Sequence, residues 1–504
     1  MNEKKKAIVS FDGKSYEALV GQTLSDVIST EQPCGGHGKC GKCKVIARGS
    51  LSEPSYTEHA LLTKEELEND VRLACCMIIN GDCEIYRVSA STEKKQILTD
   101  GIMPSFDINP VFSKYGVSLD IGTTTLAAKL YDRSGALLAE VSMLNPQSKW
   151  GADVISRIEA SLDGKASDIT KAIQNAVNGI LVSLSIKAKI QSSDIDAIVI
   201  TGNTTMLYIL VGESVEPLSH APFSIKRMLG ECLSPSDLGL SSVDLSAKIY
   251  IPSVVSAFIG ADTLCALLSS DIRALDNAML IDIGTNGEMA LWQNGTLSVC
   301  STAAGPAFEG VGISMGMRGE TGAIDKVSVC DDGLSVHTIG NAQPVGICGS
   351  GLIDTVACML ELEEIDESGF LEESPFAVTE SVSVTQKDIR AVQLAKSAIC
   401  AGARTLLSSA GIQASKIERL YIAGGFGNYL NIENAIKIGL LPRDFCDKVY
   451  VIGNAALSGA SMLLLSSHFI PKYNELAESA RVIELSSNPV FSENYMMGMF
   501  FESI

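Results

Sequence analysis

The pattern of apolar and polar positions predicts a compact series of short elements at the start of the chain. Ala7–Phe11 and Ser15–Val20 have the alternation typical of strands, and Asp12-Gly13-Lys14 between them is a hairpin turn signal. Residues 23–28 predict a short helix capped by Thr23, and Lys44–Arg48 predicts a third strand. This order of strand, strand, helix, loop and strand indicates a small α/β domain.

Farther along the chain, one pattern occurs twice. Val117–Thr125 and Met279–Gly287 each begin with a buried-strand run that ends in Asp, then turn at Gly and continue through Thr. A second strand follows each turn, at Leu126–Tyr131 and at Glu288–Trp292. Two such hairpins at strand ends indicate a duplicated α/β domain with one hairpin in each half.

Three segments are predicted to start or precede helices in this duplicated domain. The apolar strand at 420–423 runs into Gly424-Gly425-Phe426-Gly427-Asn428 and then a helix. Residues 257–262 open a helix that carries Asp262 near its start, and residues 346–351 open another. The second of these helices has an apolar face made of Leu352, Val356 and Met359.

Residues 89–115 separate the two parts. This stretch starts with Ser-Ala-Ser-Thr-Glu-Lys-Lys-Gln, contains Pro104 and Pro110 and shows little periodicity. We therefore expect a first domain at 1–88, a linker at 89–115 and a second domain at 116–504. Its lobes are predicted at about 116–275 and 276–504, with a C-terminal return. The linker is either a flexible tether or a strap packed between domains.

Composition and charge limit the partners. The 504 residues are 46% apolar with 44 glycines, which fits several α/β domains with buried cores. The formal net charge of −20 argues against nucleic acid and anionic membrane surfaces as partners. No apolar run reaches the length of a membrane span, and the basic start lacks the apolar core of a signal peptide. We expect a cytoplasmic protein.

Cysteines provide the strongest chemical signal. Cys34, Cys40 and Cys43 lie on one glycine-rich loop with C-x5-C-x2-C spacing, and Cys75 follows in Arg72-Leu-Ala-Cys. Four thiolates in this arrangement suit a 2Fe-2S cluster. Glycines allow the backbone to wrap closely around such a group, with N–H groups directed at sulfur.

Other interpretations of the cysteine loop remain open. Structural zinc sites usually contain C-x2-C twice, whereas the first gap here is five residues. His37 and His59 could only form a Rieske-type centre together, and Cys76 competes with Cys75 for the fourth position. Disulfides are not expected in this compartment. Eight later cysteines, at 232, 265, 300, 330, 348, 358, 400 and 446, are predicted to be small buried apolar residues.

The repeated hairpins have the chemistry of a nucleotide site. Asp120 and Asp282 at strand ends can hold Mg²⁺, directly or through water. Glycine lets backbone N–H groups approach phosphate oxygens, and hydroxyl or amide side chains add donors. The phosphate-binding candidates are Gly122, Thr123, Thr124, Gly284, Thr285 and Asn286.

These residues carry family resemblances. The first roughly 90 residues resemble β-grasp 2Fe-2S ferredoxins, with the x5 spacing of the adrenodoxin-type branch. Residues 116–504 resemble the ribonuclease-H-like ASKHA superfamily of acetate and sugar kinases, Hsp70 and actin. That resemblance implies adenosine binding at Gly424, Gly425 and Gly427. It also implies a catalytic carboxylate at Asp262 facing the γ-phosphate.

The fusion of the two domains resembles the reductive activators of corrinoid proteins. The resemblance extends to Asn145-Pro146-Gln147, to 151–158, to 202–206 and to 304–310. It implies ATP-dependent delivery of one low-potential electron from the cluster, converting Co(II) to Co(I). The implied partners are a corrinoid protein of an anaerobic methyltransferase system and a low-potential electron donor, with a homodimer left open. Some members carry a further domain before the first hairpin, whereas here Asp120 follows the linker directly.

Two alternative functions remain. An activator of the 2-hydroxyacyl-CoA dehydratase kind holds a 4Fe-4S cluster between two subunits, and Cys348 is the obvious analogue of its ligands. A metabolite kinase with a redox-sensing ferredoxin domain would need an acceptor pocket and would phosphorylate a substrate.

Overall fold

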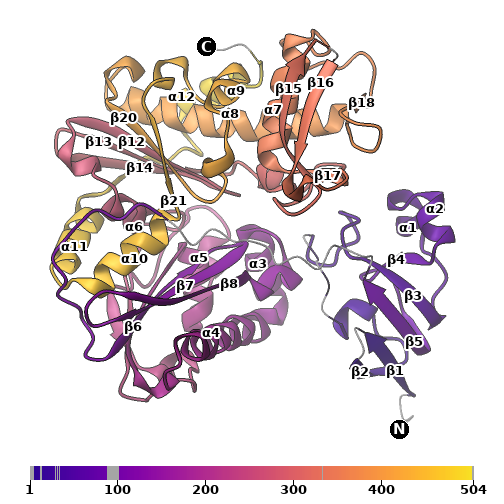
Figure 1. The fold of residues 1–504 in the computed structure, drawn as a ribbon, viewed down its shortest axis with the longest axis horizontal. Coiled ribbons are helices and arrows are strands. Elements are labelled where there is room, and N and C mark those ends of the chain that lie inside the picture. Colours follow the sequence, from indigo (N-terminus) through magenta and orange to yellow (C-terminus); the bar gives the residue numbers. More distant parts are fainter. Residues whose placement is uncertain are drawn as a thin grey trace. The chain divides into compact units, whose positions relative to one another are not determined.

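The computed structural model describes residues 5–11, 14–28, 30, 32, 34–87, 101–331 and 333–501. By contacts the chain divides into two compact units, drawn in Figure 1. Unit 1 comprises residues 1–94 and 146–172, and unit 2 comprises residues 95–145 and 173–504.

A five-stranded sheet forms the core of residues 5–87. Its order is β2-β1-β5-β3-β4, and the strands are β1 (Lys6–Phe11), β2 (Lys14–Leu19), β3 (Lys44–Leu51), β4 (Val71–Leu73) and β5 (Ile79–Arg87). β1 and β2 pair antiparallel, which confirms the predicted hairpin, although Asp12 and Gly13 lie outside the described residues. The predicted helix is a single 3-10 turn at Leu24–Asp26, and the predicted Thr23 cap is wrong because its side chain accepts no capping hydrogen bond.

A buried ion pair fixes the segment that leads to the fourth cysteine. Two short helices follow β3, α1 (Tyr56–Leu61) and α2 (Lys64–Glu68). Glu58 on α1 is fully buried and accepts hydrogen bonds from Arg72 Nε at 2.8 Å and Nη2 at 3.0 Å. It also accepts one from the backbone N–H of Leu73 at 3.1 Å. The pair therefore holds α1 against β4, two residues before Cys75.

Unit 2 contains two six-stranded sheets. The first has the order β10-β11-β9-β6-β7-β8 and the second β21-β20-β12-β13-β14-β22. The first consists of β6 (Tyr115–Ile121), β7 (Thr125–Asp132), β8 (Leu137–Leu144), β9 (Ile195–Gly202), β10 (Glu231–Leu233) and β11 (Lys248–Ile251). The second consists of β12 (Asn277–Ile283), β13 (Gly287–Gln293), β14 (Thr296–Thr302), β20 (Arg419–Ala423), β21 (Val449–Gly453) and β22 (Arg481–Val482).

The strand pairing repeats between the two sheets. β6, β7 and β8 form an antiparallel meander, and β9 lies parallel to β6 on the other side. β12, β13 and β14 form the same meander, with β20 parallel to β12. Both predicted hairpins are thus confirmed, and the sequence repeat corresponds to a repeat of the fold.

Helices α6 (Ala261–Ser269) and α10 (Ala455–Leu465) pack closely in a core that includes residues of both sheets. At Gly459 a Cβ atom would lie 2.0 Å from the carbonyl oxygen of Cys265, so glycine is required for this approach. The other α-helices of the described residues are α3 (Val154–Ala160), α4 (Ala166–Ala188), α5 (Thr204–Val211), α7 (Gly349–Glu361), α8 (Gln386–Ser409), α9 (Ile432–Lys437), α11 (Phe469–Ser479) and α12 (Pro489–Met497).

A smaller sheet precedes α7. It has the order β16-β15-β17 and is made of β15 (Ala323–Cys330), β16 (Gly333–Thr338) and β17 (Gly346–Ile347), while β18 (Phe376–Ala377) pairs with β19 (Ser383–Val384). The helix predicted from residues 346–351 is confirmed as α7. Its predicted apolar face is also confirmed, because Leu352, Val356 and Met359 are buried.

The described part of the predicted linker, residues 101–115, lies along unit 2. The N–H of Ile102 donates to the carbonyl of Ile452 on β21 at 3.1 Å, and the N–H of Asn109 donates to the carbonyl of Leu465 on α10 at 2.9 Å. The ring of Phe106 packs edge-on against Phe469 with centroids 4.9 Å apart. This stretch has the contacts of a strap, whereas residues 88–100 lie outside the described residues.

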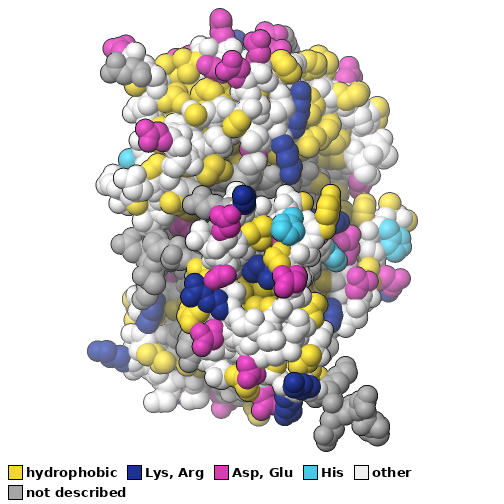
Figure 2. Space-filling model, turned by 90° about the vertical axis from the view of Figure 1, so that its right-hand side faces the viewer, with side chains coloured by type: hydrophobic (Ala, Val, Ile, Leu, Met, Phe, Trp, Pro, Cys, Tyr) yellow, Lys and Arg dark blue, Asp and Glu magenta, His cyan; other side chains and the backbone are white. Residues whose placement is uncertain are grey.

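Surface charge, helix apolarity and cysteine burial bear on three predictions from the sequence. On the face shown in Figure 2, acidic and basic side chains are interspersed and not separated by sign. Across the described ranges, no helix combines the length and the apolarity that a membrane crossing needs. Burial is confirmed for Cys265, Cys300, Cys348, Cys358 and Cys400, but the prediction is wrong for Cys232, Cys330 and Cys446, which are exposed.

Candidate nucleotide and cluster sites

The four predicted cluster cysteines come together in two pairs. The sulfur atoms of Cys34 and Cys40 are 3.3 Å apart, and those of Cys43 and Cys75 are also 3.3 Å apart. Within the described parts of the chain, no three His, Cys, Asp or Glu side chains converge to hold a single metal ion. Two thiol pairs suit two iron atoms with two ligands each better than one tetrahedral zinc ion.

The loop around these sulfurs depends on glycine. Gly35, Gly36, Gly38 and Gly41 all have positive φ angles, between 64° and 84°. At Gly38 a Cβ atom would lie 3.2 Å from Thr57 on α1 and 3.4 Å from the sulfur of Cys76. Left-handed backbone and limited space therefore both favour glycine here.

Each pair favours one thiolate beside one thiol. The hydrogen bond between Cys34 and Cys40 lowers the pKa of Cys34 to about 4 and raises that of Cys40 well above its usual range. The bond between Cys43 and Cys75 likewise lowers the pKa of Cys43 and raises that of Cys75. Cys76 lies 3.7 Å from Cys75, whereas the sulfur atoms within each pair are 3.3 Å apart. The side chains of His37 and His59 are exposed. This arrangement favours Cys75 over Cys76 as the fourth ligand.

In unit 2, the turns of the two hairpins differ in length, with residues 122–125 between the last paired positions of β6 and β7 and residues 284–286 between those of β12 and β13. The N–H of Gly122 donates to the carbonyl of Thr125 at 2.9 Å, and the N–H of Gly284 donates to the carbonyl of Asn286 at 3.1 Å. Asp120 and Asp282 are the penultimate residues of β6 and β12, immediately before these turns.

The charge of Asp262 acts on both aspartates of the hairpins, Asp120 and Asp282. It lies in the first turn of α6, where burial raises its pKa to about 6. Burial, followed by the charge of Asp262, raises the pKa of Asp120 to about 8 and that of Asp282 to about 7. Within the described ranges, no Lys or Arg forms an ion pair with any of the three. The three carboxylates do not converge on one metal position in the described residues, so a cation bound beside them would need further oxygen ligands.

Sequence reasoning missed two further carboxylates. Glu288 stands opposite Asp282 on β13, and burial followed by the charges of Asp262 and Asp282 raises its pKa well above the usual range. Glu309 accepts hydrogen bonds from the hydroxyls of Thr124 and Thr285, both at 2.6 Å. Both residues were visible in the sequence, Glu288 as the first charged position of the second strand and Glu309 inside the segment 304–310.

Two asparagines were also missed. Asn203 caps α5, and its amide donates to the hydroxyl of Thr123 at 3.0 Å. Asn454 caps α10, and its amide donates to the carboxylate of Asp120 at 3.3 Å. Each follows a strand that ends in Gly, so the repeated Gly-Asn dipeptide at a helix start was the available signal.

The glycine-rich turn after β20 lies next to the second hairpin. Gly424 has φ +87°, and a Cβ there would lie 2.5 Å from the carboxylate of Asp282. Gly425 is exposed, whereas Gly427 packs against Ile422. The ring of Phe426 stacks on Phe308, with centroids 5.4 Å apart and planes 15° apart.

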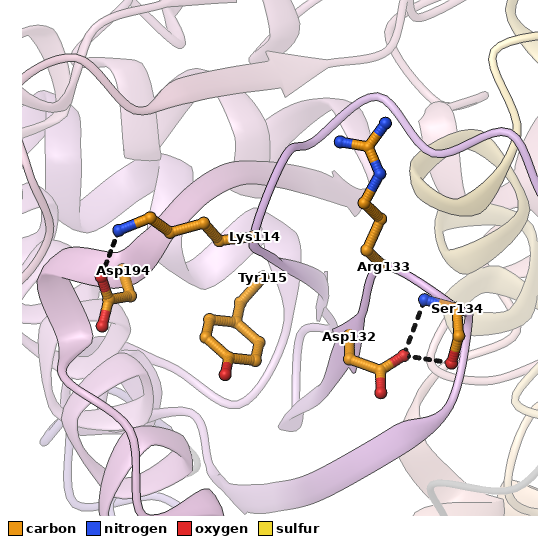
Figure 3. A pocket seen from close by; sticks show the side chains of 6 residues that line it. All are labelled: Lys114, Tyr115, Asp132, Arg133, Ser134 and Asp194. Atoms are coloured by element: carbon orange, nitrogen blue, oxygen red, sulfur yellow. Dashed lines mark hydrogen bonds and ion pairs between the residues drawn. The ribbon is translucent and has the colours of Figure 1, made fainter.

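A surface hollow lies away from these residues. A hollow of about 480 Å³ is lined by Lys114, Tyr115, Asp132, Arg133, Ser134 and Asp194 (Figure 3). It lies where β6 begins and β7 ends, at the opposite end of the hairpin from Asp120. Lys114 forms an ion pair with Asp194 at 2.7 Å, and Asp132 accepts hydrogen bonds from the N–H and the hydroxyl of Ser134.

Cys348 does not resemble an intersubunit cluster ligand. It is buried at the start of α7, and its sulfur lies 3.2 Å from the carbonyl oxygen of Ile324 and 3.4 Å from the hydroxyl of Ser350. A cluster shared between subunits needs ligands at the surface, so this position does not favour the dehydratase-activator alternative.

Comparison with known proteins identifies the family. Residues 276–504 match the model of the C-terminal domain of RACo, the ASKHA domain, and residues 115–274 match the RACo middle region. The corrinoid activation enzyme RamQ of Eubacterium limosum is 38% identical over 423 residues, which cover 77% of this chain and 70% of RamQ. The chain belongs to the reductive activators of corrinoid proteins.

A second curated relative and a solved structure are also similar to this chain. The [Co(II) methylated amine-specific corrinoid protein] reductase of Methanosarcina barkeri is 25% identical over 417 residues, covering 76% of each chain. A solved structure described as the reductive activator for corrinoid, iron-sulfur protein matches with a TM-score of 0.69 and 27% identity, covering 98% of both chains. The mixed α/β fold of unit 2 is therefore that of an ASKHA-type reductive activator.

Proposed function

We propose that this protein reactivates a corrinoid protein by delivering one low-potential electron, which converts Co(II) to Co(I) at the expense of ATP. Membership of the reductive activator family supports the reaction class. The observation that carries the proposal is the presence, in one chain, of two thiol pairs at 3.3 Å and a duplicated hairpin site lined by carboxylates.

Residues 1–88 are proposed to be a β-grasp ferredoxin domain that holds a 2Fe-2S cluster on Cys34, Cys40, Cys43 and Cys75. The two thiol pairs match the two irons of such a cluster, and the positive φ angles of the glycines would let the loop wrap closely around it. When bound, the cluster would accept and pass on single electrons. The Glu58–Arg72 pair keeps Cys75 in register with Cys43.

Residues 116–504 are proposed to bind and hydrolyse ATP. Gly122, Thr123, Thr124, Gly284, Thr285 and Asn286 would surround the phosphates, and Gly424, Gly425 and Gly427 would lie towards the adenosine. A phosphate chain carries several negative charges, and the site already contains a cluster of carboxylates without basic partners among the described residues. Mg²⁺ held by Asp120 and Asp282 would offset the negative charge of the phosphates and of the carboxylates. Asp262 would face the terminal phosphate.

The energetics explain why ATP is needed. Plant-type 2Fe-2S centres lie near about −400 mV, and we expect the Co(II)/Co(I) couple to lie lower. Each ~59 mV of uphill one-electron transfer costs about 1.4 kcal/mol. ATP turnover can favour the reduced product only by acting differently on two states of the protein.

The proposal is tested by measuring both activities in one preparation. Anaerobically purified protein should contain about two irons per chain, give an EPR signal on one-electron reduction, and hydrolyse MgATP faster in the presence of a corrinoid protein. Asp282→Asn should abolish hydrolysis and leave the EPR signal of the reduced cluster unchanged. Normal hydrolysis in that variant would exclude the hairpins as the nucleotide site.

A further inference from the structure

One carboxylate connects the two hairpins. Glu309 Oε2 accepts a hydrogen bond from the Thr124 hydroxyl at 2.6 Å, and Glu309 Oε1 accepts one from the Thr285 hydroxyl at 2.6 Å. The two threonines belong to turns of different six-stranded sheets. A single side chain thus ties together the two halves of the duplicated fold at the point where they present their phosphate-binding donors.

The backbone holds Glu309 in this position. It ends the 3-10 turn Pro306–Glu309, whose preceding Gly305 donates its N–H to the carbonyl of Thr285 at 2.9 Å. The following Gly310 has φ +76°, and a Cβ there would lie 2.4 Å from the carbonyl oxygen of Met317. Neither a longer side chain at Gly310 nor a shift of the turn is readily accommodated.

Both hydroxyl protons are already used. A threonine hydroxyl has one proton to donate, so a hydroxyl that donates to Glu309 cannot also donate to phosphate. The backbone N–H groups of the turns remain, but the two side-chain donors and the two carboxylate oxygens are matched one to one. Within the described ranges, no Lys or Arg forms an ion pair with Glu309. Phosphate oxygens and the Glu309 carboxylate therefore compete for the same donors.

We infer that Glu309 is a clasp between the hairpins, which the phosphates of a bound nucleotide displace from Thr124 and Thr285. This inference rests on the proposed binding of ATP at the hairpins. Release of the clasp removes the hydrogen bonds by which Glu309 links the two halves of unit 2. Loss of the nucleotide re-forms these hydrogen bonds. Glu309 is a positioning residue in this scheme, since it acts through the threonines.

The clasp also contacts the predicted adenosine side. Phe308, the neighbour of Glu309, is buried and stacks on Phe426 of the glycine-rich turn. The carbonyl of Phe308 lies where a Cβ at Gly349 would be 2.0 Å away, at the start of α7. Displacement of Glu309 would therefore change the packing of Phe308 against Phe426 in the turn that follows β20.

Calorimetric titration of the holoprotein distinguishes this role from others. The wild type, Glu309→Ala and Glu309→Gln are titrated with MgATP, MgADP and adenosine, and thermal melts confirm folding. Glu418→Gln is the matched control. That carboxylate is exposed and accepts from the N–H groups of Asp276 and Asn277 at the other end of β12.

Removal of the clasp should tighten MgATP and MgADP binding about tenfold, because two hydroxyl donors become free for charged acceptors. Glu309→Gln should give an intermediate gain, and Glu418→Gln should give none. Adenosine, which has no phosphates, should bind all variants alike. Equal or weaker MgATP binding by Glu309→Ala would overturn the clasp, and weaker binding would instead make Glu309 a ligand of the metal–nucleotide complex. Failure of the wild type to bind MgATP would overturn both the clasp and the proposed function.

Discussion

Asp282 and Glu288 occupy directly opposite positions on β12 and β13. Opposite residues of an antiparallel pair lie on the same face, and like charges there are destabilising. The first hairpin has Asp120 opposite Ala127, so the second hairpin alone carries this repulsion. A paired carboxylate at a strand end is retained at a cost to stability, which is characteristic of a functional site.

Replacement of Glu288 by Gln should stabilise the metal-free protein at high pH. The folded state raises the pKa of Glu288, so its ionisation opposes folding. That penalty is absent below the pKa of the unfolded chain and grows as the pH rises towards the folded pKa. We expect a gain on the order of 1–2 kcal/mol at pH 8 and almost none at pH 4.

Thermal melts with a chelator at the two pH values measure this effect. Glu372→Gln, at an exposed position, serves as the control. Equal stabilisation by Glu288→Gln at both pH values would show that the carboxylate pair is not the source.

Binding of MgATP should release protons. Burial raises the pKa of Asp262 to about 6, and burial together with the charge of Asp262 raises those of Asp120 and Asp282 to about 8 and 7, so these groups are partly protonated at pH 7. A cation at the site displaces these protons, and the affinity for MgATP should therefore increase from pH 6 to pH 8.5. Calorimetry in two buffers with different ionisation enthalpies counts the protons. Asp120→Asn should reduce the number released, and proton uptake on binding would contradict the assignment.

The two adjacent cysteines should differ sharply. Cys75→Ser removes the partner of Cys43 and should lose or distort the cluster, whereas Cys76→Ser should leave it largely intact. Iron content and the EPR spectrum of the reduced protein measure the difference. A damaging Cys76→Ser with a harmless Cys75→Ser would reverse the assignment of the fourth ligand.

The strap at 101–115 should matter for unit 2 itself. A chain that begins at residue 101 should fold and hydrolyse ATP, because it keeps the backbone bonds to Ile452, Leu464 and Leu465. A chain that begins at residue 116 lacks them and should melt at a lower temperature.

Neither shortened chain should reduce cobalt. Residues 1–88 added separately at micromolar concentration should restore little, since a tether provides an effective concentration nearer millimolar. Full cobalt reduction by the chain from residue 101 would remove the cysteine domain from the electron path.

Local patterns in the sequence predicted the two hairpins and the duplication of the fold, because Asp, Gly and Thr at a strand end specify a turn by themselves. They could not predict the clasp at Glu309, since its partners Thr124 and Thr285 come from turns far apart in the chain. The position of Glu288 opposite Asp282 was missed because it depends on the register between β12 and β13. The sequence left open whether residues 101–115 form a tether or a strap, because they show little periodicity. In the structure, the backbone N–H groups of Ile102, Asn109 and Val111 donate to β21 and α10.

The visible spectrum of a corrinoid protein during anaerobic reaction tests the central claim most directly. A partner in the Co(II) state is mixed with the reduced activator, and the appearance of Co(I) is followed with MgATP, with MgADP or without nucleotide. We predict that Co(I) forms only with MgATP and an intact cluster, and that Asp282→Asn and Cys75→Ser both fail. Formation of Co(I) at the same rate without ATP, or by the Cys75→Ser protein, would contradict the account.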